Sequence, residues 1–150
     1  MLDIQGDELE RLAQVLVNNE TIAQYIIDLV SSQEAKNTTK IMEVLFGGAI
    51  ATKASDIHIE AQDEQVRIRF RQDGVLQDIA DITHEVYKKI LSRIKLLSDM
   101  KLTQTKNAQD GRFTIDYAGK EVEVRVSVIP SAYGESVSYT HLTLPTTSRV

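Results

Sequence analysis

The chain has 150 residues, of which 42% are hydrophobic and 26% charged, so it can bury one sizeable core and is not disordered as a whole. Its net charge of −5 argues against a protein drawn as a whole onto nucleic acid or an anionic membrane. Without cysteine it has no disulfide, thiolate metal site or cysteine nucleophile, and no apolar run reaches the ~20 residues of a membrane-spanning helix. We therefore expect a cytoplasmic protein.

The first third of the chain has the hydrophobic pattern of amphipathic helices. Apolar residues recur every three or four positions, including Leu9, Leu12, Leu16, Ile22 and Ile26. Residues 31–39 are almost entirely polar, which is typical of a linker. We interpret residues 1–36 as a separate helical element with its linker.

The next predicted helix runs over about residues 40–53. Ile41, Leu45 and Ala49 fall on one face of it. Gly47 and Gly48 each cost roughly 1 kcal/mol relative to Ala inside a helix, so their presence predicts close packing at that point.

From Asp56 the hydrophobic period changes to two, which indicates half-buried strands. Residues 56–60 and 65–71 alternate, and in the second run Val66, Ile68 and Phe70 face one way. Asp73–Gly74 is typical of a type I′ turn, in which both central residues have positive φ. Residues 75–79 should therefore pair back on the preceding strand.

The second half predicts a further helix and a second hairpin. Thr83 should cap a helix that ends near Met100. After a polar connection at residues 101–110, alternating runs at 113–117 and 122–128 flank Ala118–Gly119. The elements together predict an α+β fold, with an antiparallel sheet and flanking helices, preceded by a small helical element.

No pattern of catalytic residues is visible. The seven glycines form neither GxxxxGK[ST] nor GxGxxG, and no serine stands in a GxSxG turn. His58, His84 and His141 lack the spacing of metal ligands. Asp56 and Glu60 share a strand face about 13 Å apart, too far for a general acid–base pair. The chain itself is expected to be non-catalytic, with no metal site.

Arginines form the most distinctive surface. Arg67, Arg69 and Arg71 alternate along one strand, so their guanidinium groups project from one face at roughly 7 Å intervals. Such groups can bind carboxylates or phosphates of a partner. Alternatively, they are the solvated face of a strand, neutralised by Asp78, Glu121 and Glu123. Both interpretations stay open on spacing alone.

Five blocks of sequence carry a family resemblance. They are ASDIHIE at 54–60, RIRFRQDGVL at 67–76, SRIK at 92–95, QDGR at 109–112, and VRVS at 124–127 followed by PS at 130–131 and GE at 134–135. In this order and spacing, residues 38–137 resemble the domain that precedes the RecA-like core in type II secretion and type IV pilus assembly ATPases. The resemblance implies that residues 37–136 form a PAS-like domain.

The resemblance also implies a function. The chain would be the non-catalytic N-terminal domain of a hexameric motor ATPase, and ATP and Mg would belong to the intact parent rather than to this chain. The arginines that match the family and could reach the nucleotide phosphates are Arg69, Arg71, Arg93, Arg112 and Arg125. The implied partners are its own ATPase domain, neighbouring subunits and an inner-membrane assembly platform, at the cytoplasmic side of that membrane. A freestanding PAS-like module that senses an anion or other ligand is the alternative, and nucleic acid is disfavoured.

The sequence departs from the family at three places. Ala61 stands where the family commonly has Pro, and Lys106-Asn107-Ala108 stands where it has Arg-x-Pro. From Val137 to Thr147 the amino-acid sequence resembles a translated sequencing-library adaptor. We therefore expect residues 137–150 to be a non-native tail that orders poorly or packs opportunistically.

Overall fold

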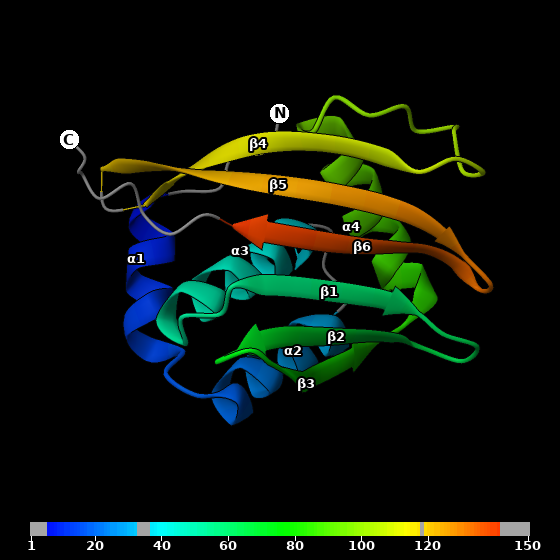
Figure 1. Ribbon diagram of the computed structural model, residues 1–150. Helices are drawn as coiled ribbons and strands as arrows, with labels where there is room; N and C mark the ends of the chain where they lie inside the picture. Colours follow the sequence, from blue (N-terminus) through cyan, green and yellow to red (C-terminus); the bar gives the residue numbers. More distant parts are fainter. Residues whose placement is uncertain (1–5, 33–36, 118, 142–150) are drawn as a thin grey trace.

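The computed structural model describes residues 6–32, 37–117 and 119–141, which form four helices and a six-stranded sheet (Figure 1). The helices are α1 (Gly6–Val15), α2 (Asn19–Ser32), α3 (Asn37–Ala51) and α4 (His84–Leu97). The strands are β1 (Asp56–Ala61), β2 (Val66–Gln72), β3 (Val75–Ile82), β4 (Gln109–Tyr117), β5 (Lys120–Ser131) and β6 (Gly134–His141). The predicted α+β class is confirmed.

The sheet has the strand order β3-β2-β1-β6-β5-β4, and every neighbouring pair is antiparallel. The four described helices lie against one face of the sheet, as Figure 1 shows. Alternate strand residues such as Ile57, Ile68 and Val126 point to that face and are buried. Their neighbours form the opposite, polar face, which we call the open face.

Helix α3 occupies the centre of the helical layer. Sequence analysis predicted one buried face, whereas residues 41–49 are all buried, because α1 and α2 contact the helix as well as the sheet. The predicted close packing at its glycines is confirmed. A Cβ on Gly47 would lie 3.0 Å from Cβ of Leu12, and one on Gly48 would lie 2.8 Å from Cδ1 of Ile22.

Helices α1 and α2 share the hydrophobic core of the sheet. Leu9, Leu12, Leu16, Ile22 and Ile26 are buried in the same cluster as the inward-facing strand residues. The helices of residues 1–36, which the polar stretch suggested as a separate element, therefore pack on the same core as the rest of the described chain.

Local signals placed the turns and one helix start correctly. Asp73 and Gly74 have φ of 53° and 80°, as the predicted type I′ turn between β2 and β3 requires. Thr83 caps α4, where its Oγ1 accepts a hydrogen bond from Val86 N at 3.2 Å. The second predicted hairpin is confirmed as β4 and β5, with Gly119 at φ 80° in the turn.

Strand β6 lies between the two hairpins and joins them into one sheet. It pairs with β1 on one side and β5 on the other, and Val137 and Tyr139 are buried. Residues 137–141 are thus part of a strand whose backbone is paired on both edges, and the expectation of a non-native tail stays a prediction. Residues 142–150 lie outside the described residues, and the adaptor origin of the segment stays a prediction.

Candidate functional site

The arginines of β2 lie on the open face, as their alternation predicted, and each is paired with a carboxylate. The ion pairs are Arg67 Nε to Asp81 Oδ1 at 3.1 Å, Arg69 Nε to Asp78 Oδ1 at 2.9 Å, and Arg71 Nε to Asp56 Oδ2 at 2.9 Å. All three cross to a neighbouring strand, because β2 lies between β1 and β3. Asp81 raises the pKa of Arg67 through its hydrogen bond and its charge. The β2 arginines are thus neutralised within the sheet.

The partners differ in part from those expected. Asp78 is one of the predicted neutralising residues and does pair with Arg69. Glu123 instead lies on β5 and pairs with Arg112, since β1 and β6 separate β5 from β2. Sequence spacing could not foresee this separation, because the strand order is set by β6.

Arg112 and Arg125 form a second group on the open face. They lie directly opposite each other in the register of β4 and β5. Both approach the single carboxylate of Glu123, at 3.1 Å from Arg112 Nη1 and 4.0 Å from Arg125 Nε. Their side chains are 74% and 65% exposed, about twice as much as those of the β2 arginines. These two cations share one anion among the described ion pairs.

Arg93 lies apart from both groups. It belongs to α4, on the helical side of the sheet, and its Nη1 donates a hydrogen bond to Thr39 Oγ1 at 2.7 Å. This bond connects α4 to α3. The five arginines that the family resemblance singled out therefore occupy three places and do not converge on one site within this chain.

The two histidines whose side chains the structure describes, His58 and His84, lie apart. His58 Nδ1 lies 3.3 Å from Ser138 Oγ on the open face, whereas His84 Nε2 lies 2.7 Å from Gln62 O at the start of α4. Among the described residues no group of three or more histidines and carboxylates could hold a metal ion.

In the same part of the chain no helix is long and apolar enough to cross a membrane.

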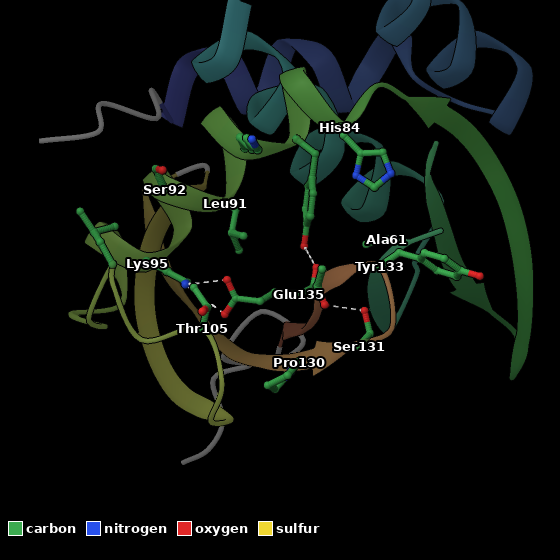
Figure 2. A pocket seen from close by; sticks show the side chains of 14 residues that line it. Ala61, His84, Leu91, Ser92, Lys95, Thr105, Pro130, Ser131, Tyr133 and Glu135 are labelled. Atoms are coloured by element: carbon green, nitrogen blue, oxygen red, sulfur yellow. Dashed lines mark hydrogen bonds and ion pairs between the residues drawn. The ribbon is translucent and has the colours of Figure 1, made fainter. Parts of the chain in front are cut away.

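A buried ion pair was missed by sequence analysis. Lys95 Nζ donates to both carboxylate oxygens of Glu135, at 2.8 and 3.0 Å, and the two side chains are only 3% and 8% exposed (Figure 2). Tyr87 Oη also donates to the backbone oxygen of Glu135, at 2.5 Å. Lys95 falls one turn after Leu91 on the apolar face of α4, and a charge at such a position was the available signal. The contacts fasten α4 to the first residues of β6.

Around this ion pair the surface forms a pocket of about 490 Å³ (Figure 2). Its walls are one side of α4, the loop after that helix, and the turn between β5 and β6. The lining residues are Ala61, His84, Tyr87, Lys88, Leu91, Ser92, Lys95, Leu102, Thr105, Pro130, Ser131, Tyr133, Gly134 and Glu135. The pocket and the open face are on different sides of the sheet.

Comparison with known proteins assigns the chain to a family. The sequence pattern of the family described as "Type II/IV secretion system protein" matches residues 9–146. The chain belongs to this family. The recognition made from the five sequence blocks is confirmed.

Relatives in the family are type II secretion proteins. The chain is 35% identical over 132 residues to the type II secretion system ATPase E of Vibrio cholerae serotype O1, covering 88% of this chain and 25% of that protein. It is 37% identical over 139 residues to the type II secretion system protein E of Klebsiella pneumoniae, covering 91% and 26%. With the protein E of Pseudomonas aeruginosa, identity is 36% over 110 residues, covering 73% and 22%. The chain thus spans about a quarter of the length of the curated relatives it matches.

The sequence blocks that carry the family resemblance have structural reasons in the fold. The block at 92–95 supplies Lys95 and the GE pair supplies Glu135, so two blocks 40 residues apart meet in the buried ion pair. In QDGR, a Cβ on Gly111 would lie 2.7 Å from the backbone oxygen of Ser98, where α4 ends. Glycine is therefore required there because a backbone carbonyl occupies the space.

Proposed function

We propose that this chain is the domain that precedes the ATPase core in a type II secretion ATPase. The observation that carries the proposal is the family match over residues 9–146, together with relatives whose length is about four times the matched segment. The chain contains no nucleotide-binding glycine motif, so the domain contributes contacts and charge rather than the chemical step. Its partners are its own ATPase domain, neighbouring subunits of a hexamer, and an inner-membrane assembly platform.

In this function ATP and Mg are held by the ATPase domain, and arginines of this chain approach the phosphates. Arg112 and Arg125 are the best suited of the five, because they are the most exposed and share one carboxylate. A triphosphate could replace Glu123 as their counterion without leaving a buried charge behind. The β2 arginines would first have to leave the aspartates that pair with them.

Two measurements test the proposal. The purified chain should hydrolyse no ATP, whereas the intact parent should turn it over; hydrolysis by the chain alone contradicts the assignment. In the intact parent, Arg112→Ala and Arg125→Ala should each lower kcat at least about tenfold, since charge on the transferring phosphoryl group would be less stabilised. Thermal stability should be nearly unchanged, because exposed ion pairs contribute little to folding.

Arg67→Ala is the matched control. It removes the same charge from the same face of the sheet, but from a side chain already paired with Asp81. Turnover by this variant should stay within about twofold of the parent. If all three variants lose activity equally, or lose it only in proportion to stability, the arginines serve the sheet and the proposed role of Arg112 and Arg125 is wrong.

A further inference from the structure

Helix α4 and the loop after it are rich in positive charge. Residues 84–106 contain six basic and two acidic residues, a net charge of +4 in a chain whose total is −5. Each of the β2 arginines forms an ion pair with a carboxylate, as described above. Lys88, in contrast, is exposed, lines the pocket, and has no ion-pair partner among the described residues. An uncompensated ammonium group therefore stands at the pocket.

The floor of the pocket adds a buried hydrogen-bond donor. A lysine ammonium has three N–H donors, and Lys95 directs two of them to Glu135. The third is available within the described part of the chain. Hydroxyl groups of Ser92, Thr105 and Tyr133 also line the pocket (Figure 2). The polar atoms of Lys95 and Thr105 lie close together in Figure 2, whereas the hydroxyl of Tyr133 points away from them.

The remaining wall of the pocket is apolar. Leu91 and Pro130 line it, and Leu102 and Tyr133, which are 47% and 54% exposed, give it large hydrophobic side chains. Its volume of about 490 Å³ is within the range of small-molecule sites, which combine apolar walls with a few polar groups.

We propose that this pocket binds a monocarboxylate that carries an apolar or aromatic body. The charge of Lys95 is cancelled by Glu135, so the pocket offers the single uncompensated charge of Lys88, which one carboxylate matches. A dianionic phosphate would leave excess negative charge beside Glu135. The apolar body would contact Leu91, Leu102 and Tyr133. The site uses none of the strand arginines, so it is independent of the function proposed above.

The carboxylate could belong to a free small acid or to an acidic side chain beside an apolar residue in a peptide, and two probes distinguish these sources. The ¹⁵N-labelled chain is titrated with sodium 4-phenylbutyrate and, separately, with the peptide acetyl-Phe-Leu-Asp-amide. Amide signals of residues 84–95 and 130–135 should shift and saturate. Saturation by one probe alone supports the proposal and identifies the source. Absence of saturation by both up to 10 mM, roughly the weak limit for specific sites, overturns it.

Charge specificity is tested with uncharged and dianionic probes. The neutral analogue 4-phenylbutyramide should bind several-fold more weakly than the acid, because it lacks the charge that Lys88 attracts. Inorganic phosphate should not saturate the same signals. If the amide binds as well as the acid, or if phosphate binds more tightly, the proposed ligand class is wrong.

Two lysines on α4 provide a matched pair of variants. Lys88→Gln and Lys89→Gln remove the same charge from adjacent exposed positions of one helix, but only Lys88 lines the pocket. Lys88→Gln should weaken binding of 4-phenylbutyrate about two- to fivefold, the range expected for an exposed charge pair, whereas Lys89→Gln should leave it unchanged. Equal weakening by both variants would mean that the anion is attracted only by general charge, and would overturn the site.

Discussion

Replacing Lys95 with Met should strongly destabilise the fold, because it leaves the carboxylate of Glu135 buried without a partner. At the observed 2.8 Å and an effective dielectric constant of about 20, the attraction between the two charges is about 6 kcal/mol. Much of that attraction offsets the desolvation of both groups. Removal of one partner from such a pair therefore costs about 3–5 kcal/mol in unfolding free energy, a large part of the roughly 5–15 kcal/mol that holds a domain together.

The double variant Lys95→Met/Glu135→Leu separates the charge from the packing. Both charges are then absent, and two apolar side chains of similar size occupy nearly the same space. The double variant should be within about 2 kcal/mol of the original chain, so it should be more stable than either single variant. This reversal is the signature of a buried pair that is costly to break but contributes little net stability.

Urea unfolding followed by circular dichroism at 222 nm measures all four proteins of this cycle, since the chain has no tryptophan to report by fluorescence. Lys88→Gln serves as the control for loss of an α4 lysine and should change the unfolding free energy by no more than about 0.5 kcal/mol. If Lys95→Met costs less than about 1 kcal/mol, or if the effects of the two single changes simply add, Lys95 and Glu135 are not coupled as the structure indicates.

Two further predictions concern close packing and pH. Gly111→Ala should lower the unfolding free energy by about 1–3 kcal/mol, because its Cβ would lie 2.7 Å from the Ser98 carbonyl oxygen. The control Thr114→Ala, on the exposed face of the same strand, should lower it by less. Equal effects of the two variants in urea unfolding would contradict the packing argument. Burial, and secondarily the charge of Glu135, raise the pKa of Tyr87 above its usual value of 10.0. The contribution of this hydroxyl to the unfolding free energy is therefore fully present below pH 10 and is lost as the pH rises further. Between pH 10 and 11 this group should remove about 1 kcal/mol, and Tyr87→Phe should show a correspondingly smaller decline in alkaline unfolding experiments.

Features that depend on neighbouring residues were predictable from the sequence. The Asp73–Gly74 turn, the Thr83 cap and the outward direction of Arg67, Arg69 and Arg71 each follow from backbone preferences or a two-residue period. The family resemblance was equally accessible, because it rests on the order of short blocks along the chain.

Features that depend on which strands are neighbours were decided only by the tertiary structure. The alternation of β2 says that its arginines share a face, but not that Asp56, Asp78 and Asp81 lie across from them. Likewise, the spacing of α4 marks Lys95 as inward-facing, yet its partner is 40 residues away. A charge on an apolar helical face indicates that a partner exists, while the tertiary packing determines which residue that partner is.

The sequence by itself determined the α+β class, the two hairpins and the family of this protein, since these depend on local propensity and on the order of motifs in the chain. The tertiary structure decided that β6 joins the hairpins into one sheet, that the family-matched arginines occupy three separate places, and that a pocket surrounds Lys95 and Glu135. The physical reason is that the side chains of a strand alternate in direction with a period of two residues, which the sequence shows directly. The partners of that strand are instead selected by burial and backbone pairing across the whole domain.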